Sequence, residues 1–196
     1  MKKLVLLLAV AAFIGFAFTN PTEVKSYKID KEKSSIAWKA YKVTGSHEGT
    51  ISLQDGELNF KKGVLVSGSF EIDMRTITVT DLEGEYKGKL EGHLKSDDFF
   101  GVTQNPIASF ETTSVKAADA ANSYNVTGNL TLKGITNEIS FVANVDDSKT
   151  PLETTATLKI DRTKYNVRYG SNSFFDNLGD KAIYDEFDLE IKLVTK

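Results

Sequence analysis

From Ser26 onward, hydrophobic and polar residues alternate along most of the chain. Because successive side chains of a β-strand point to opposite faces, this period of two predicts strands with one apolar face each. The clearest apolar faces are Ile36, Trp38 and Ala40; Val64, Val66, Gly68, Phe70, Ile72 and Met74; Tyr124, Val126, Gly128, Leu130 and Leu132; Ile139, Phe141, Ala143 and Val145; Thr154, Ala156, Leu158 and Ile160; and Phe187, Leu189, Ile191 and Leu193. Shorter runs at 26–30, 49–53, 58–60 and 106–115 complete the predicted set.

Two of these runs are predicted to form a long hairpin. The segment Lys133–Asn137 separates them and contains Gly134, which is typical of a turn. Long strands joined in sequence by hairpins predict an all-β, mainly antiparallel domain, either an up-and-down barrel or a sandwich. The strand lengths favour the closed barrel, because closure removes the exposed edges at which long strands aggregate.

The inward faces of this predicted barrel mix bulky and small residues. Gly68, Gly128 and Ala143 alternate with aromatic and aliphatic side chains. An eight-stranded barrel has room either to fill its interior with side chains or to hold one ligand. Periodicity alone leaves both alternatives open: unfilled volume for a ligand, or small and large residues interlocked in a solid core.

One segment departs from the period of two. Its apolar residues are spaced by four, as on one stripe of an amphipathic helix: Leu82, Tyr86, Leu90 and Leu94. Three glycines lie in the same stretch, so the helix is expected to be short or irregular. The loop Lys95–Gly101 follows and carries Phe99 and Phe100, which we expect to act as a lid. Asp146–Pro151 and Ser171–Lys181 are the predicted exposed loops.

The N-terminal residues have the pattern of a secretory signal peptide. Lys2 and Lys3 precede an apolar run, Leu4–Phe18, that is interrupted only by Gly15. A membrane-spanning helix needs about 20 apolar residues, so the run favours a cleaved signal over a retained helix. We therefore expect residues 1–19 to be removed. Residues 20–196 are expected to form one soluble domain in the periplasm or outside the cell, with no stable membrane anchor.

Composition excludes several classes of protein. The sequence has no cysteine, which rules out a disulfide scaffold, thiol catalysis and an acylated-cysteine anchor. It has 24 basic and 27 acidic residues, a net charge of −3 and no basic block, which argues against a nucleic-acid partner. The sequence does not define an oligomeric state, and a homodimer is compatible with it.

A series of motifs resembles the YceI-like, polyisoprenoid-binding family. The motifs are Tyr27–Asp30 with Ser34–Trp38, Gly45–Gly49, His93–Phe100 with Pro106–Phe110, Val126–Gly134, and Ile160–Arg162. They come in the family's order and cover nearly the whole chain after the signal peptide. The resemblance implies a lipocalin-like, usually eight-stranded barrel, exported to the bacterial periplasm or secreted, with an isoprenoid chain or other long amphiphile inside. Gly101 departs from the pattern, because the family usually has an acidic residue there.

Two polar side chains are candidates for contact with a ligand head group. His93 precedes the predicted lid, and it either lies near a ligand or fixes the helix-to-loop turn by hydrogen bonding, which is the favoured alternative. Arg162 shares the parity of Ile160 and is expected to point inward, where an unpaired charge is costly. We favour a structural pair with Asp185 over contact with an anionic head group such as a phosphate.

The other predicted ligand contacts are aromatic or small. They are Trp38, Phe70, Phe110, Gly128, Phe141 and Phe187 on the inward faces, with Phe99 and Phe100 on the lid. Core filling alone explains buried aromatic residues, and only the family resemblance favours ligand contact. His47 and His93 with Asp97 and Asp98 lack the spacing of a metal site, and no metal is predicted.

The common signatures of catalysis are missing from the sequence. It has no G-x-S-x-G, no H-E-x-x-H and no phosphate-binding glycine loop. We therefore favour a non-enzymatic carrier that holds a polyisoprenoid or similar long-chain amphipathic lipid, including a quinone, without another cofactor. The alternative is a stress-response or interaction module whose barrel is solid. An enzyme acting on an isoprenoid quinone or lipid is the third reading.

Overall fold

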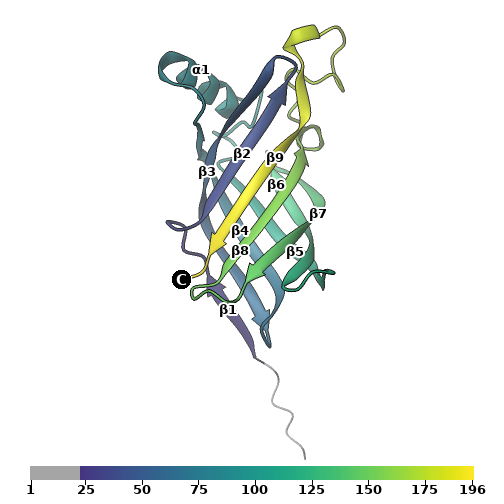
Figure 1. Ribbon diagram of the computed structural model, residues 1–196. Coiled ribbons are helices and arrows are strands. Elements are labelled where there is room, and N and C mark those ends of the chain that lie inside the picture. Colours follow the sequence, from purple (N-terminus) through teal and green to yellow (C-terminus); the bar gives the residue numbers. More distant parts are fainter. Residues whose placement is uncertain (1–22) are drawn as a thin grey trace, which may run out of the picture.

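The structure, a computed structural model, describes residues 23–196 (Figure 1). The predicted signal peptide, residues 1–19, lies outside the described residues, so its removal stays a prediction. Within residues 23–196, no helix has the length and apolar character needed to cross a membrane.

Nine strands and one α-helix make up the described chain. The strands are β1 (Val24–Lys28), β2 (Ser35–Lys42), β3 (Gly45–Lys61), β4 (Val64–Val79), β5 (Ile107–Ala117), β6 (Ser123–Leu132), β7 (Ile135–Asp146), β8 (Glu153–Asp161) and β9 (Ile183–Val194). The helix α1 (Gly84–Lys95) lies between β4 and β5, and two 3-10 helices, η1 (Arg162–Tyr165) and η2 (Gly179–Lys181), lie between β8 and β9.

These nine strands close into a barrel with eight strand positions around its circumference, because two of the strands occupy the same position. Their order is β1-β3-β2-β9-β8-β7-β6-β5-β4, and β4 pairs back onto β3. β1 pairs with the C-terminal end of β3, where Tyr27 lies opposite Leu58, whereas β2 pairs with the N-terminal end, where Trp38 lies opposite Gly49. β1 and β2 therefore share one position. The prediction of a closed, eight-stranded, lipocalin-like antiparallel barrel with one helix is confirmed.

The longest strand differs from its prediction. The runs predicted at 49–53 and 58–60 belong to one continuous strand, β3. Its pairing with β4 shifts register between Thr50 and Ser52 and again between Leu53 and Asp55. At the first shift β4 advances five residues, from Thr78 to Asp73, while β3 advances two, and at the second β3 advances two while β4 advances one. Such bulges change which side chains point inward. The period of two is lost there, although the backbone stays extended.

The turn between β6 and β7 is shorter than the predicted segment Lys133–Asn137. Leu132 pairs directly with Ile135, so Lys133 and Gly134 form a two-residue turn. Both have positive φ, 51° and 73°, as a type I′ hairpin turn requires. The predicted exposed loop that begins at Ser171 also differs in part, because Ser171 is fully buried.

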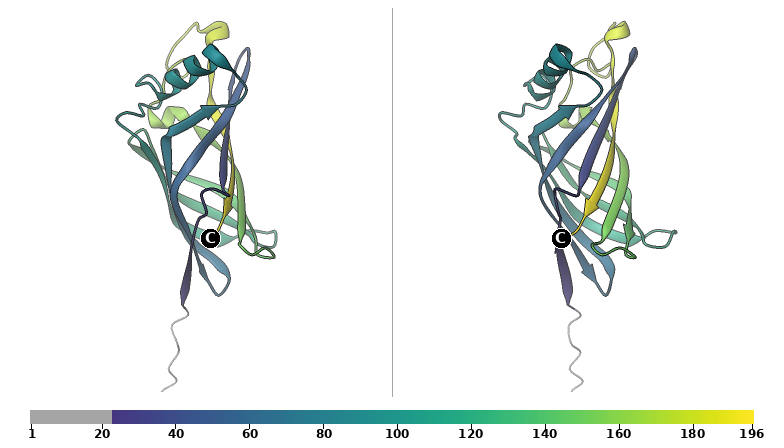
Figure 2. Two further views of the ribbon diagram at one scale, coloured as in Figure 1. Left: turned by 90° about the vertical axis from the view of Figure 1, so that its left-hand side faces the viewer. Right: turned by 60° about the vertical axis from the view of Figure 1, so that its left-hand side comes forward.

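The helix α1 lies at one end of the barrel, which we call the upper end (Figure 2). The predicted stripe is only partly correct: Leu94 is buried and Leu90 packs against the core, but Tyr86 is 74% exposed. With 3.6 residues per turn, residues four apart drift by about 40° around the helix axis. A strict spacing of four therefore does not stay on one face.

The loop after α1, residues 96–105, folds over the upper end, and we call it the lid. The Phe100 N–H donates to the Leu94 carbonyl (3.2 Å) and the Gly101 N–H to the Ser96 carbonyl (2.8 Å). Phe99 and Phe100 are both buried as a result. Gly101 has a φ of 56°, which a residue with a side chain rarely adopts, and this explains a glycine at that position.

Two clusters of buried side chains fill the two ends of the barrel. The upper cluster includes Trp38, Ile77, Leu94, Phe99, Phe100 and Tyr165. The lower cluster includes Ile29, Leu58, Phe60, Leu65, Tyr124 and Leu193. Ile51, Ile72 and Leu189 are partly buried and pack against both clusters. The interior between the clusters is thus bordered by apolar side chains.

Glu91 joins α1 to the barrel wall. Its Oε1 accepts hydrogen bonds from the Thr78 hydroxyl (2.5 Å) and the Val79 N–H (2.9 Å). These bonds, the Thr78 bond first, lower the pKa of Glu91 below its ordinary value of 4.5. Glu91→Gln keeps the shape but removes the charge, so we expect the free energy of unfolding to fall by about 1 kcal/mol at neutral pH.

The effect of Glu91→Gln should depend on pH. A carboxylate with a lowered folded-state pKa stabilises the protein above its unfolded-state pKa, and that stability is lost as the pH falls through the folded-state value. Urea unfolding of both proteins should therefore show a difference at neutral pH that shrinks in acid. Glu85→Gln, on the exposed side of α1, is the control and should change little. A difference that is constant with pH would contradict the role of the Glu91 charge.

Candidate functional site

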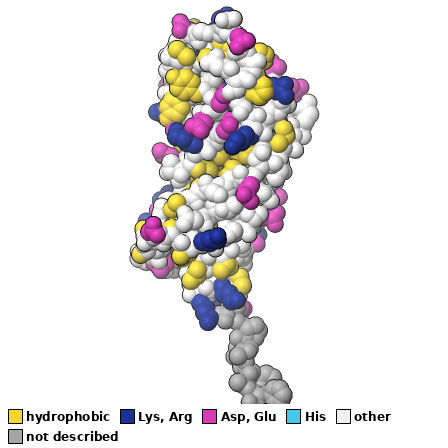
Figure 3. Space-filling view, turned by 90° about the vertical axis from the view of Figure 1, so that its right-hand side faces the viewer, with side chains coloured by type: hydrophobic (Ala, Val, Ile, Leu, Met, Phe, Trp, Pro, Cys, Tyr) yellow, Lys and Arg dark blue, Asp and Glu magenta, His cyan; other side chains and the backbone are white. Residues whose placement is uncertain are grey.

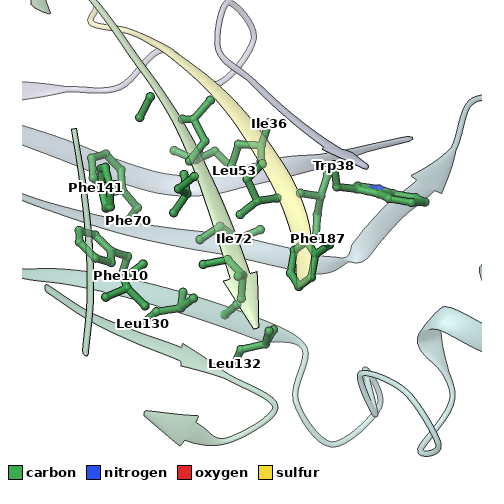
Figure 4. Close-up of a pocket in the computed structure, with 18 of the residues that line it drawn as sticks. Ile36, Trp38, Leu53, Phe70, Ile72, Phe110, Leu130, Leu132, Phe141 and Phe187 are labelled. Atoms are coloured by element: carbon green, nitrogen blue, oxygen red, sulfur yellow. The ribbon is translucent and has the colours of Figure 1, made fainter. Parts of the chain in front are cut away.

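An apolar cavity of about 200 Å³ lies inside the barrel, between the upper and lower clusters. Its wall includes side chains from all eight strand positions, from α1 and from the lid. Figure 4 shows Phe70, Phe110 and Phe141 grouped in one part of the wall, with Trp38 and Phe187 in another. The interior therefore offers large apolar surfaces around an unfilled space.

Small residues on neighbouring strands create this space. Ala143 on β7 lies opposite Ala156 on β8, and both border the cavity. Gly68 on β4 and Ala108 on β5 border it as well. A solid core would interlock such small side chains with large ones across the barrel. The cavity shows that the small and large side chains of this barrel do not interlock completely.

Most of the predicted contact residues border the cavity. They are Trp38, Phe70, Phe99, Phe100, Phe110, Phe141, Arg162 and Phe187. Contact of each with a ligand stays a prediction. Sequence reasoning missed the wall residues Ile51, Leu53 and Leu58 on β3, because the register shifts of that strand hide the face that they share.

Gly128 was predicted to contact the ligand and does not border the cavity. A Cβ at this position would lie 2.4 Å from Phe110 Cζ and 2.5 Å from the Glu111 carbonyl oxygen. The Phe110 ring covers the glycine and is itself the surface that borders the cavity. The small residue is therefore required by the close approach of β5, and it does not leave space for a ligand.

His93 also lies away from the cavity wall. Its ring packs edge-on against Phe99 (5.5 Å between ring centroids) and Tyr169 (4.4 Å). Its carbonyl accepts hydrogen bonds from the N–H and the hydroxyl of Ser96 (3.1 and 2.7 Å). The backbone carbonyl of His93 thus fixes the connection from α1 to the lid, whereas its ring packs against aromatic neighbours.

Arg162 is buried, but it does not continue β8. It is the first residue of η1, and its guanidinium donates to the carbonyls of Tyr184 (3.0 Å), Val167 (2.8 Å) and Ile183 (3.0 Å). The predicted partner Asp185 forms an ion pair with Arg162, with Nη2 and Oδ1 3.7 Å apart, but this distance is too long for a hydrogen bond. Burial lowers the pKa of Arg162, and the nearby aspartates oppose the shift. The arginine therefore joins η1 to the start of β9 mainly through backbone carbonyls.

The cavity wall carries few polar atoms. The indole N–H of Trp38 and the hydroxyl of Thr154 are buried, and neither has a hydrogen-bond partner within the described chain. Buried polar groups are seldom left unpaired in native proteins. Both residues border the cavity, so a polar group of an occupant, or a water molecule, could satisfy them.

The two histidines lie apart and have different partners. His47 Nδ1 lies 2.8 Å from Asp81 Oδ2 on the outer surface, whereas His93 packs against rings at the upper end. Within residues 23–196, no three His, Cys, Asp or Glu side chains group in a way that could hold a metal ion.

The sequence matches a known family over most of its length. Residues 27–195 match the YceI-like domain. The chain belongs to the YceI-like family. A UPF0312 protein from Pseudomonas aeruginosa is 32% identical over 148 residues, which cover 68% of this chain and 73% of that relative. The resemblance seen in the sequence motifs is confirmed.

Solved structures share the YceI-like barrel. Burkholderia cenocepacia BcnA superposes with a TM-score of 0.70 at 22% identity, over 86% of this chain and 99% of BcnA. A polyisoprenoid binding domain from Saccharophagus degradans superposes with a TM-score of 0.62 at 16% identity, over 87% and 97% of the two chains. At these identities, the likeness shows the common fold.

The anchoring role of Arg162 can be measured by unfolding. Arg162→Ala leaves three carbonyl oxygens without their donor, so we expect the free energy of unfolding to fall by about 3 kcal/mol or more. Lys164→Ala, an exposed change in the same η1 helix, is the control and should stay within about 0.5 kcal/mol of the parent protein. Equal stability of the two variants in urea would show that the guanidinium does not hold this end together.

Proposed function

We propose that this protein is a non-catalytic carrier that holds a polyisoprenoid or similar long-chain amphipathic lipid inside the barrel. The apolar cavity between the two end clusters is the observation that carries the proposal. Membership of the YceI-like family supports it, as does the common fold with a polyisoprenoid binding domain. Such cavities, with few polar groups, are typical of sites for apolar ligands.

Burial of the chain would supply most of the affinity. Each CH₂ group removed from water contributes about 0.8 kcal/mol before the costs of ordering the ligand. The unpaired Trp38 N–H lies in the upper cluster and the Thr154 hydroxyl lies beside the lower cluster, and each offers a hydrogen bond to a polar group of the ligand. An isoprenoid quinone, a polyprenyl alcohol or phosphate, and a fatty amide all fit this description, because each joins a long apolar chain to one polar group.

The two alternative functions, an interaction module with a solid barrel and a lipid-modifying enzyme, have less support. A stress-response or interaction module with a solid barrel would have no need of an unfilled interior. A lipid-modifying enzyme would need an acid, a base or a nucleophile beside its substrate. Arg162 is the only charged side chain among the described residues that border the cavity, and its hydrogen bonds go to backbone carbonyls.

Ala156→Phe tests the carrier against the solid barrel. The new ring would project into the cavity opposite Ala143, so we expect loss of the bound lipid from a protein that still folds. In a solid core, the same change would overpack and cost about 1–3 kcal/mol. Native mass spectrometry of the purified protein, followed by organic extraction, measures the bound molecule, and urea unfolding measures the stability.

The control for this experiment is Glu190→Phe. Glu190 lies on the exposed face of β9, next to Ile191, which pairs with Ala156. This variant should keep the lipid at the stoichiometry of the parent protein. A folded Ala156→Phe protein with the same lipid content would refute the cavity as the binding site. A parent protein that carries no extractable lipid and binds none would refute the carrier function.

Export is part of the proposal, and it rests on Lys2, Lys3 and the apolar run Leu4–Phe18. Fractionation of cells that produce the full sequence should find a shortened, soluble protein in the periplasm or the medium. Replacing Leu7 and Leu8 with lysine would interrupt the apolar run and should leave the unprocessed protein in the cytoplasm. Full-length protein retained in the inner membrane would contradict cleavage.

A further inference from the structure

We infer that the lipid chain enters and leaves the barrel sideways, between β7 and β8, and not through either end. The inference rests on the proposed function. β7 and β8 form only four residue pairs, from Ala143–Ala156 to Asp146–Glu153. The neighbouring ladders are longer, with ten pairs between β6 and β7 and nine between β8 and β9. β7 and β8 therefore share fewer residue pairs with each other than either strand shares with its other neighbour.

The unpaired stretch lies directly above this short ladder. Continuing the register would place residues 138–142 of β7 opposite residues 157–161 of β8, but these residues form no pairs with each other in the described chain. We call the stretch the seam. Asn137 Nδ2 donates to the Lys164 carbonyl (3.0 Å), which connects β7 to η1 above the seam. The seam is thus an unpaired stretch, bounded below by the β7–β8 ladder and above by the hydrogen bond from Asn137 to Lys164.

The inner side of the seam is part of the cavity wall. Ile139 and Phe141 from β7 and Leu158 and Ile160 from β8 all border the cavity. On the outer side, Val142 is 44% exposed at the lower end of the seam. Figure 3 views the side that carries β7 in Figure 1, and hydrophobic side chains are visible across the middle of this face, among charged ones. An apolar chain that passes through the seam would meet apolar side chains on both edges.

The upper end would be costly to open. Opening it would expose Phe99 and Phe100, which are both buried, and would break the backbone bonds that hold the lid. Arg162 lies over the Phe99 ring at 5.6 Å, and Lys133 Nζ donates to the Asp97 carbonyl (2.8 Å). Each of these contacts stabilises the closed lid.

The lower end is closed as well, because Phe60, Leu65 and Tyr124 are buried there. Widening the seam differs from opening either end, since its two edges share no ladder pairs within residues 23–196. Ser140 and Lys159 point outward at the edges and are exposed, and polar groups of this kind discourage pairing with another chain. Widening the seam therefore leaves the contacts of both ends intact.

Cysteine pairs can test this route, because the sequence contains no cysteine of its own. Ser140→Cys with Lys159→Cys puts one thiol on each edge of the seam, and a bis-maleimide then links them. The matched control, Thr157→Cys with Glu190→Cys, links β8 to its paired neighbour β9. Stopped-flow fluorescence follows the uptake of N-phenyl-1-naphthylamine, an apolar dye that brightens in an apolar site, before and after linking.

We expect the linked seam to slow dye uptake by roughly tenfold or more, since uptake then requires a different conformational change. Equilibrium binding and the rate of the linked control should stay the same as before linking. Equal uptake rates in the two linked proteins would overturn the inference. Slower uptake only in a third linked protein, Asp97→Cys with Lys133→Cys, would place the route at the lid and would also overturn it.

Equilibrium binding separates this inference from the function on which it rests. A parent protein that takes up no dye at equilibrium would refute lipid binding itself, and the lateral route with it. A parent protein that binds dye, with a rate that does not respond to the seam link, would keep the carrier function and refute only the route.

Discussion

The pairing of β3 with β4 is the contact on which the rest of the structure depends. It joins the two ends of the sheet, and closure makes one face of every strand an interior. The strands at this junction are also the longest, and the register shifts of β3 allow it to bend around the barrel. Once the barrel is closed, the choice of inward side chains decides whether the interior is solid or hollow.

Two charged groups at the upper end form their hydrogen bonds away from the hollow part of the interior. Arg162 is turned toward three backbone carbonyls, and Glu91 is turned toward β4 outside the wall. Each group stabilises a connection at the upper end of the barrel: η1 with β9, and α1 with β4. The hydrogen bonds of these two charged groups go to the backbone and to Thr78, so a large apolar surface lies beside charged residues without unpaired charge.

Alternation along the chain predicted most of the strands, the barrel and most of the cavity wall. It failed where the backbone departs from regular geometry, as at the register shifts of β3 and at the two-residue turn of Lys133 and Gly134. It also assigned Gly128 to the ligand, because periodicity gives the face of a residue but not what covers it. Arg162 was placed inward correctly, yet its partners depend on where β8 ends and η1 begins, which parity does not define.

Some of the family motifs lie at the upper end of the barrel, where the backbone is irregular, whereas Tyr27–Asp30 lies at the lower end. His93, Phe100 and Arg162 belong to motifs of the resemblance, and all three lie in or beside the lid and η1. The strands between the ends need only the correct alternation, which many sequences satisfy. The irregular backbone of the upper end needs particular residues, such as the buried arginine, and few sequences satisfy that.

The shared position of β1 and β2 also determines how the molecule is oriented when it is attached to something. Val24 pairs with Lys61 at the lower end, and the N–H of Lys196 donates to the Lys28 carbonyl (2.8 Å), so both ends of the described chain emerge at the base (Figure 1). A tether, a tag or a fused domain at either terminus therefore leaves α1 and the lid pointing away from the attachment point. On a surface or a sensor chip, the barrel axis would point away from the surface, and the outer faces of all the strands would be exposed to solvent.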